Sequence, residues 1–378
     1  MKFSYNTLQE LIDKKLPPAK ELAEQLTLHC FECEGVEEHN SDVILDLDIL
    51  PNRAHDCASH IGVARDIAAL IGGVLQQPQT ADLSFSTQQD IFKVSVVENQ
   101  ACDRYSAVYM EGVKVQDSPD WLKQRLEALG LNSINNLVDV ANYVMLLTGQ
   151  PLHIFDYDKL TGSGKKEIVV RKANNGETIT GLDNNEYTLN NDMLVIADNQ
   201  NVLGVAGIKG GKIAEVDKNT TNIVIESAHF EPVGIRKTSR ALGLQTDASW
   251  RFERNVPVCF TTMGLGTTVA HIQSVAGGRV GGAVDENTTT EHKLNIQVQF
   301  EEVNQLIGVE VQKQQVIDVL EKLEFVVEQK GDTLNTTPPQ FRLDVAIKED
   351  VIEEVVRMYG YENVAQQAIS THLSLIHI

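Results

Sequence analysis

The sequence lacks any apolar run that approaches the roughly 20 residues a membrane-spanning helix needs. Its first residues, MKFSYNTLQELIDKK, are polar and amphipathic, without the apolar centre of a signal peptide. We therefore predict no export signal and no membrane partner, and we expect a cytoplasmic protein.

Cysteines are few. There are five, at the irregular positions 30, 33, 57, 102 and 259. An odd number at such spacing indicates reduced thiols in the cytoplasm rather than a disulfide framework. Cys30 and Cys33 form a C-x-x-C pair, but no second pair lies at the spacing of a zinc site. We interpret this pair as a coincidence.

Basic residues are too few to balance the acidic ones. The chain has 32 Lys and Arg against 53 Asp and Glu, a net charge of −21. Affinity for nucleic acid comes largely from basic side chains that neutralise phosphates. The composition therefore argues against a strong stand-alone nucleic-acid binder, and another chain must hold most of any RNA substrate.

What is present points to a multidomain α+β protein. A length of 378 residues and 42% hydrophobic content fit a soluble chain of two to four domains. Hydrophobic periodicity predicts a small α/β unit (1–75), a linker (76–90), a large mixed α+β region (91–285), a winged-helix-like unit (292–362) and a tail (363–378). Within the first unit we expect helices over residues 7–14, capped by Asn6, and 56–71.

One histidine follows a constrained turn. His153 comes directly after Gly149-Gln150-Pro151, which ends an apolar segment, residues 138–147, predicted to be a buried helix. Glycine and proline fix the backbone of such a turn, so the imidazole is held in a set place. This suits a binding or catalytic group, although a lone histidine near an apolar segment is more often a packed side chain.

A buried acid is predicted at the end of another strand. Glu226 ends an apolar stretch, residues 222–226, and a buried carboxylate needs a partner. The partner is either a ligand hydroxyl or a nearby arginine in a structural pair. The glycines of residues 205–211 let backbone approach a ligand, but they lack the G-x-x-x-x-G-K-[ST] pattern, so ATP binding is not supported.

Four carboxylates near the C-terminus could hold a cation. Asp350, Glu353 and Glu354 share one face of a predicted helix, and Asp344 lies one loop away. An all-oxygen set suits Mg²⁺ rather than zinc. The alternative is that acids in the first turns simply complement the helix dipole.

Several motifs, in order along residues 50–361, closely resemble the β subunit of bacterial phenylalanine–tRNA ligase. They are LPNRAHD (50–56), SHIGVAR (59–65), SPDWL (118–122), the segment 135–156, AGIKGG (206–211), ESAHF (226–230), TDASWRFER (246–254), RLD (342–344) and DVIEEVVRMYGY (350–361). The resemblance implies a B1-like N-terminal unit, a B3/B4-like editing domain and a B5-like winged-helix domain.

The resemblance also implies roles. The middle domain would hydrolyse tyrosine wrongly attached to phenylalanine tRNA, with His153, Glu226 and Thr246 as its catalytic residues. Glu226 would bind the tyrosine hydroxyl and His153 would lie beside the ester, where either His153 or the substrate's ribose hydroxyl activates water. The residues implied to form the substrate pocket are Asn142, Gly210, Glu226, Thr246 and Ala248.

The resemblance further implies partners and a metal. The four carboxylates Asp344, Asp350, Glu353 and Glu354 match a magnesium site near the contact with an α subunit. The chain would work in an α₂β₂ complex with phenylalanine tRNA, in which the α subunit binds ATP and attaches phenylalanine.

The sequence departs from the family pattern in ways that leave alternatives open. No segment matches the OB-fold insertion expected between residues 35 and 49, and the sequence stops at residue 378, after an abrupt 372–378, before the family's C-terminal domains, so we expect a truncated chain. Asn132 and Ala141 stand where the family often has arginine and threonine. A structural subunit with a decayed pocket is therefore the main alternative to an editing subunit, and a free-standing deacylase is a third.

Overall fold

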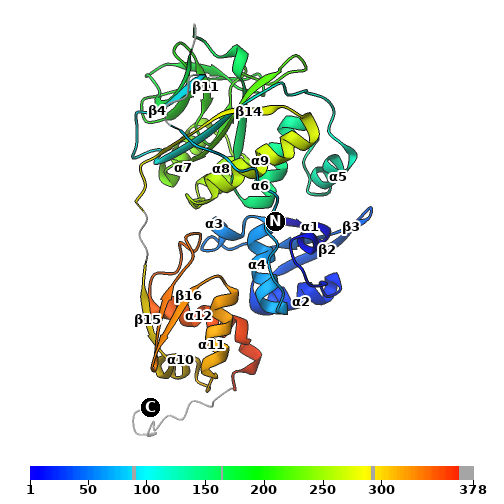
Figure 1. Cartoon of the computed structure of the whole chain (residues 1–378), viewed down its shortest axis with the longest axis vertical. Coiled ribbons are helices and arrows are strands. Elements are labelled where there is room, and N and C mark those ends of the chain that lie inside the picture. The colour runs from blue at the N-terminus through cyan, green and yellow to red at the C-terminus, as the bar shows by residue number, and fades with distance from the viewer. Residues whose placement is uncertain (87–90, 163–164, 291–293, 366–378) are drawn as a thin grey trace, which may run out of the picture.

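The computed structural model describes residues 1–86, 91–162, 165–290 and 294–365. The predicted tail from residue 366 onward and part of the predicted linker lie outside these ranges. Figure 1 shows three bodies along the long axis: the middle region of the chain at the top, the N-terminal unit in the centre and the winged-helix-like unit at the bottom. The predicted multidomain α+β class is confirmed.

The N-terminal unit packs helices on a small antiparallel sheet of order β1-β3-β2. Its elements are β1 (Lys2–Ser4), α1 (Tyr5–Glu10), α2 (Ala19–His29), β2 (Cys33–His39), β3 (Asp42–Leu47), α3 (Ala54–Cys57) and α4 (His60–Ile71). The first helix begins earlier than predicted, because the Ser4 side chain, not Asn6, accepts the capping hydrogen bond from the Thr7 amide at 3.0 Å.

The helix predicted over residues 56–71 is two helices, α3 and α4. Ser59 caps α4 by accepting a hydrogen bond from the Gly62 amide. At Gly62 a Cβ atom would lie only 2.0 Å from the Asp56 carbonyl oxygen. The chain can therefore turn this tightly between the two helices only with glycine at that position.

The middle region contains two larger sheets. An antiparallel sheet of order β14-β5-β13-β6 lies beside a five-stranded sheet of order β12-β11-β10-β7-β4, in which β4 and β7 are parallel. The strands are β4 (Phe92–Val96), β5 (Arg104–Glu111), β6 (Leu152–Asp156), β7 (Lys166–Lys172), β8 (Thr178–Thr180), β9 (Glu186–Thr188), β10 (Leu194–Ala197), β11 (Val202–Val205), β12 (Lys209–Gly210), β13 (Asn222–His229) and β14 (Arg279–Asn287). The helices are α5 (Asp120–Ala128), α6 (Asn136–Thr148), α7 (Pro232–Leu242), α8 (Asp247–Phe252) and α9 (Phe260–Ala276).

The last unit has three helices and a three-stranded sheet of order β15-β17-β16, the arrangement expected of a winged helix. Its elements are β15 (Ile296–Gln299), α10 (Phe300–Ile307), α11 (Lys313–Lys322), β16 (Val326–Lys330), β17 (Thr333–Thr337) and α12 (Lys348–Tyr359). Among the described residues, no helix is long and apolar enough to cross a membrane.

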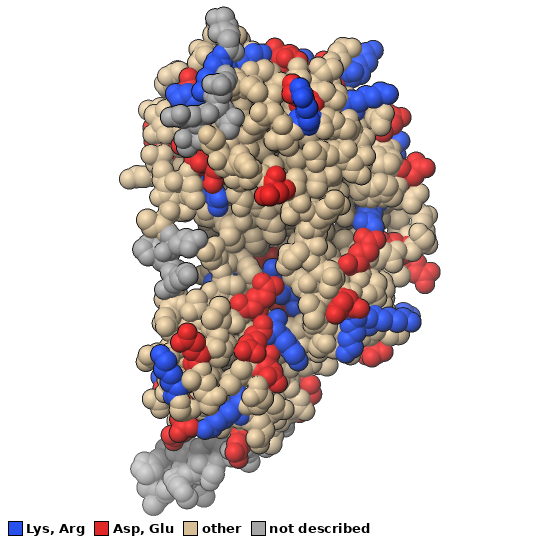
Figure 2. Space-filling view, viewed as in Figure 1, with Lys and Arg blue, Asp and Glu red and all other residues tan. Residues whose placement is uncertain are grey.

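Charged side chains are mixed over the surface. On the face in Figure 2, Lys and Arg alternate with Asp and Glu, and the basic residues form no continuous stripe there. A protein that holds a nucleic acid mainly by its phosphates needs such a stripe. The viewed surface therefore agrees with the composition, which argues against strong stand-alone binding of RNA.

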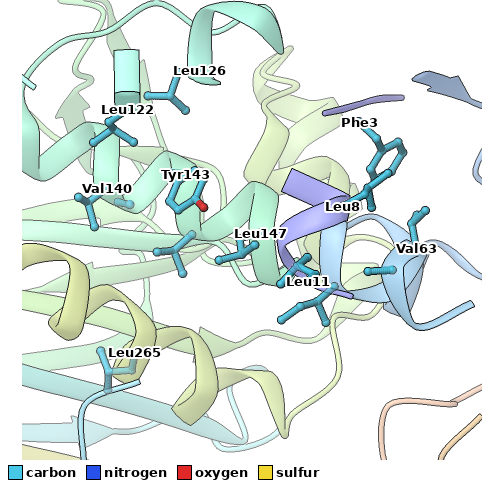
Figure 3. Close-up of a cluster of buried hydrophobic side chains, with 14 of the residues drawn as sticks. Phe3, Leu8, Leu11, Val63, Leu122, Leu126, Val140, Tyr143, Leu147 and Leu265 are labelled. Atoms are coloured by element: carbon cyan, nitrogen blue, oxygen red, sulfur yellow. The ribbon is translucent and has the colours of Figure 1, made fainter. Parts of the chain in front are cut away.

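One hydrophobic core extends across the boundary predicted near residue 75. Phe3, Leu8, Leu11 and Val63 of the N-terminal unit belong to the same buried cluster as Leu122, Val140 and Leu265 from helices α5, α6 and α9. Figure 3 shows side chains of this cluster from Phe3 and Val63 on one side to Leu122 and Val140 on the other, with Leu11 and Leu147 between them. Helices α5, α6 and α9 of the middle region are therefore packed against the N-terminal unit.

Candidate active site in the middle region

The antiparallel sheet places His153 and Glu226 side by side. In the pairing of β6 with β13, His153 is directly opposite Glu226, and on the other edge of β13 Glu226 is opposite Ala107 of β5. Side chains of directly opposite residues point to the same face of a sheet. Two residues 73 positions apart in sequence are thus neighbours on one face.

Glu226 is buried, with one hydroxyl partner. Its side chain is in a residue only 7% exposed, and its Oε2 accepts a hydrogen bond of 2.7 Å from the Tyr105 hydroxyl. Burial raises the pKa of the Glu226 carboxyl to about 7, and the Tyr105 hydrogen bond opposes this rise. The alternative that Glu226 forms a structural pair with an arginine is wrong, because its partner is a neutral tyrosine.

The second carboxylate oxygen of Glu226 is available to a ligand. Within the described parts of the chain, the hydrogen bond of the Glu226 side chain is made by Oε2, and Glu226 lines a cavity. A ligand that donates a hydrogen bond to this oxygen would satisfy it, whereas a ligand without a donor would displace water from it and leave it without a partner.

His153 stands at the same cavity as a neutral imidazole. The ring lies edge-on to Phe155, with 4.5 Å between ring centroids. Burial lowers the pKa of His153 to about 4, so the ring is uncharged near neutral pH. A neutral imidazole can accept a hydrogen bond from water or donate one to a substrate oxygen.

Gly210 keeps the space over the imidazole open. A Cβ atom at this position would lie 2.4 Å from Cε1 and 2.9 Å from Nε2 of His153. No side chain larger than hydrogen fits there unless the ring moves. The predicted pocket glycine is therefore in direct contact with the predicted catalytic histidine.

The cavity is lined mostly by apolar residues and is open to solvent on one side; about 440 Å³ of space, open solvent included, is free of protein atoms there. Its polar side chains, among the residues described, are His153, Glu226 and Lys209, and Lys209 also lies 3.4 Å from Asp183. Its apolar walls come from Leu152, Phe155, Ile196, Val205, Ile208 and Phe252. A pocket of this kind suits an aromatic side chain whose polar end meets Glu226.

The remaining predicted pocket residues differ in their positions. Ala248 lines the cavity. Thr246 does not appear among the lining residues described; it caps α8, and its hydroxyl donates to the Ile208 carbonyl at 3.1 Å. Asn142 lies on α6, half-buried, and is likewise not among them. Thr246 thus fixes a wall of the cavity, and its contact with substrate stays a prediction, as does that of Asn142.

The two departures from the family pattern also lie away from the described cavity lining. Asn132 is exposed before α6, and Ala141 is buried in that helix. Neither residue is among those found to line the cavity. Their presence therefore removes no hydrogen-bonding group from the walls described here.

Sequence reasoning missed Tyr105 and Lys209. Tyr105 is fully buried on β5 and bonds Glu226, while Lys209 contributes a cation to the cavity. Local patterns give no signal for Tyr105, because its contact depends on the register between β5 and β13. Only the Gly-rich segment around Lys209 marked a ligand-facing loop.

The four carboxylates near the C-terminus do not fit a magnesium site in this arrangement. Arg342 occupies both oxygens of Asp344, with hydrogen bonds of 2.9 and 2.8 Å, and also donates to Glu354 at 2.7 Å. Asp350 accepts from the amides of Ala346 and Ile347, and Glu353 is exposed. Across the described residues no group of three or more His, Cys, Asp or Glu is placed to hold a metal ion.

These arginines instead join two units of the chain. Arg357 of α12 donates to Asp66 of α4 at 3.1 Å and to Glu354 at 2.6 Å, and Arg53 also lies 3.3 Å from Asp66. The neighbouring guanidinium groups hold the pKa of Glu354 well below its usual range, against the effect of burial. The cluster formed by Arg53, Asp56, Asp66, Arg342, Asp344, Glu354 and Arg357 is called the interdomain charge network below.

Comparisons with known proteins identify the domains. The B3/4 domain family matches residues 101–277, and the tRNA synthetase B5 domain family matches residues 296–361. The chain thus combines a B3/4 domain, which contains the cavity, with a B5 domain.

The same comparisons confirm the resemblance stated from the sequence: the chain is homologous to phenylalanine–tRNA ligase beta subunits. It is 41% identical to that of Protochlamydia amoebophila over 86% of this chain and 40% of the relative. It is 38% identical to that of Rhodopirellula baltica over 97% of this chain and 54% of the relative. The chain therefore spans about half the length of these curated relatives, or less.

A solved structure shares the fold. An N-terminal fragment of the phenylalanyl-tRNA synthetase beta subunit from Pyrococcus horikoshii superposes with a TM-score of 0.53 at 19% identity, covering 95% of this chain and 99% of that one. At this identity the match supports the fold and not the chemistry of the site.

Proposed function

We propose that this chain is the part of a phenylalanine–tRNA ligase β subunit that hydrolyses tyrosine wrongly attached to phenylalanine tRNA. The need for such a site is physical. A pocket built for phenylalanine rejects an isostere with one added hydroxyl only weakly, so a second site must select that hydroxyl.

The observation that carries the proposal is the free oxygen of Glu226. It lies at an apolar cavity, and its carboxylate already has one neutral donor, Tyr105. The phenolic hydroxyl of tyrosine would supply the second donor. Phenylalanine has none and would leave the oxygen unsatisfied, at a cost of about 1–3 kcal/mol.

The chemistry assigned to this cavity is ester hydrolysis. Water attacks the carbonyl carbon of the aminoacyl ester, the bond to the tRNA ribose oxygen breaks, and free tyrosine and tRNA leave. His153, neutral near pH 7, would bind and orient that water through a ring nitrogen. Gly210 leaves room for the ester beside the ring, and Ala248 and the wall held by Thr246 would bound the substrate.

The partners are proposed from the homologous proteins. An α subunit in an α₂β₂ complex would bind ATP and attach phenylalanine, and the tRNA would be held mostly by other parts of that complex, since this chain carries a net charge of −21. A cytoplasmic location follows from the same assignment. No step is assigned to Mg²⁺, because the arginines of the interdomain charge network already occupy Asp344 and Glu354, two of the four predicted ligands.

The main alternative remains a structural subunit without editing activity. The interdomain charge network supports a structural contribution from the B5 domain, because it fastens that domain to the N-terminal unit. The two functions are compatible in one chain. They differ in whether the cavity around Glu226 binds and hydrolyses a tyrosyl ester.

A deacylation assay tests the proposal. The chain is incubated with phenylalanine tRNA carrying either tyrosine or phenylalanine, and loss of each ester is followed beside Glu226→Gln and a matched surface variant, Glu111→Gln. We expect faster loss of tyrosine, abolished in Glu226→Gln and kept in Glu111→Gln, whose residue pairs with Arg279 at the sheet edge. Equal loss of both esters at the uncatalysed rate would favour the structural subunit.

A further inference from the structure

Tyr105 is a buried tyrosine next to the proposed specificity residue. It lies on β5 opposite Ala228, two positions along from the pair of Ala107 and Glu226. Diagonal neighbours in an antiparallel pair share a face and are within reach of an aromatic side chain. The small side chains of Ala107 and Ala228 leave the space through which the phenol reaches the carboxylate.

We propose that Tyr105 is a positioning residue, which holds Oε2 of Glu226 by a hydrogen bond so that Oε1 faces the substrate side chain. The inference rests on the proposed function and extends it. It assigns the selectivity for a hydroxyl to two residues acting together, Glu226 as the acceptor and Tyr105 as the group that orients it.

Orientation matters because glutamate is flexible. A free glutamate side chain samples many rotamers and loses that freedom on binding. Because the buried Tyr105 hydroxyl holds Oε2 at 2.7 Å, much of the conformational entropy of this side chain is already lost on folding. Pre-organised acceptors bind a donor more tightly than mobile ones for the same contact.

The hydrogen bond also defines what the pocket accepts. The Tyr105 hydroxyl has one proton, and that proton is directed to Oε2. The ionised carboxylate therefore presents Oε1 purely as an acceptor, so a ligand must bring a donor to it. Tyrosine has such a donor at the end of its ring, and phenylalanine does not.

Few other ionisable groups act on Glu226. Those near it are Tyr105 and Cys102 around the start of β5, His153 on β6, and Lys209 of the same cavity, which lies 3.4 Å from Asp183. Burial raises the pKa of both the Tyr105 phenol and the Cys102 thiol well above their usual ranges, so both are neutral. Since His153 is also neutral, the Tyr105 hydrogen bond is the contact that favours the charged form of Glu226.

The test compares Tyr105→Phe with Tyr109→Phe. Tyr109 lies on the same strand and face and is 6% exposed, but it makes ring contacts with Phe92 and Tyr157 instead of a bond to Glu226. Binding of free tyrosine and free phenylalanine is measured across pH by ligand-observed NMR. Folding of each variant is checked by its amide spectrum.

We expect Tyr105→Phe to reduce the preference for tyrosine by about tenfold, the size of one lost hydrogen bond. The pH midpoint of tyrosine binding should also rise, because the interaction that opposes protonation of Glu226 is gone. Tyr109→Phe should change neither. A rise in midpoint distinguishes positioning of the carboxylate from a general loss of packing.

The outcomes separate the two proposals. If the native chain does not prefer tyrosine, the proposed function fails. If it does and Tyr105→Phe keeps both the preference and the midpoint, only the role of Tyr105 is overturned. Should Tyr105→Phe not fold, the native chain labelled with ¹³C at the tyrosine ring serves instead: the Tyr105 signal must follow the titration of Glu226 and lose this dependence in Glu226→Gln, and an unresponsive signal overturns the inference.

Discussion

Two regions of the molecule bury carboxylates in opposite ways. In the interdomain charge network, Glu354 accepts hydrogen bonds from Arg342 and Arg357, and its pKa is held well below the usual range. In the cavity, Glu226 has only the neutral Tyr105 as a partner, and burial raises its pKa to about 7. Both residues are less than a tenth exposed, so burial alone does not decide the behaviour of a glutamate.

The difference shows how to separate structural from functional acids. A buried carboxylate whose oxygens are all taken by guanidinium groups has no capacity left for a ligand, and it stabilises the contact between units. A buried carboxylate with one free oxygen at a cavity is unfavourable until a ligand completes it. In this chain the first pattern occurs at the contact between the N-terminal unit and the B5 domain. The second occurs at Glu226, the proposed specificity residue.

Breaking the network should give the largest effect on stability. In Asp66→Asn, Arg53 and Arg357 lose their shared carboxylate, and removal of one partner from a buried ion pair costs about 3–5 kcal/mol. Because of this cost, we expect the contact between the N-terminal and B5 units to be lost at a lower urea midpoint in this variant than in the native chain. Asp332→Asn, at an exposed pair with Lys313, should leave the midpoint nearly unchanged, and an equal shift in both variants would contradict this account of the network.

Replacing Glu226 should raise the stability of the folded chain, whereas replacing Asp66 should lower it. Its pKa rises from 4.5 to about 7 on folding, so the folded chain binds more protons in this window. The contribution of Glu226 to stability is present below pH 4.5 and is lost as the pH rises through about 7. Glu226→Gln has no such proton to lose.

We therefore expect the stability of Glu226→Gln relative to the native chain to increase as the pH rises from acidic to mildly alkaline. The upper limit of this gain is about 3 kcal/mol, because the pKa of the Glu226 carboxyl rises from 4.5 to about 7. Denaturant unfolding of both chains at several pH values measures it. A difference that does not change with pH would show that Glu226 titrates normally.

Filling the space at Gly210 should reduce activity. In Gly210→Ala the new Cβ would overlap the His153 ring at 2.4 Å, so the imidazole must move. Misplacement of a catalytic group by about 1 Å can cost roughly 100-fold in rate, and we expect a loss of up to this size in tyrosyl-ester hydrolysis. Gly35→Ala, where no atom lies within 4 Å of the new Cβ, is the control that should keep full activity.

The smallest expected effect concerns Asp350. Its carboxylate binds the Ala346 and Ile347 amides at the start of α12, and loss of such a cap costs about 1 kcal/mol. Asp350→Ala should lower the unfolding midpoint by this amount equally with Mg²⁺ and with EDTA. A loss seen only with Mg²⁺ would show that the residue binds the ion, contrary to the arrangement described.

Much of the fold could be predicted because its signals are local. Gly149 ends α6, as the apolar segment followed by a Gly-x-Pro turn predicts. The single helix expected over residues 56–71 is two, since a serine cap at Ser59 and the close approach at Gly62 interrupt an otherwise continuous periodicity. Local sequence therefore located elements better than it located the breaks between them.

The site was predictable only in part. His153 and Glu226 were identified by their motifs, but their proximity depends on the register of β6 with β13, for which the sequence carries no local signal. Helical spacing brought Asp350, Glu353 and Glu354 together as candidate ligands. It could not show that Arg342 would also bind Glu354, because that requires the tertiary contact between α12 and the loop before it.

The most direct measurement of the central claim is the binding of free tyrosine and free phenylalanine to the native chain and to Glu226→Gln by ligand-observed NMR. No tRNA is needed, so the acidic surface of the chain does not affect the result. We expect tyrosine to bind in preference to phenylalanine, and Glu226→Gln to lose this preference while remaining folded. Equal binding of the two amino acids, or no binding at all, by a folded native chain would contradict it.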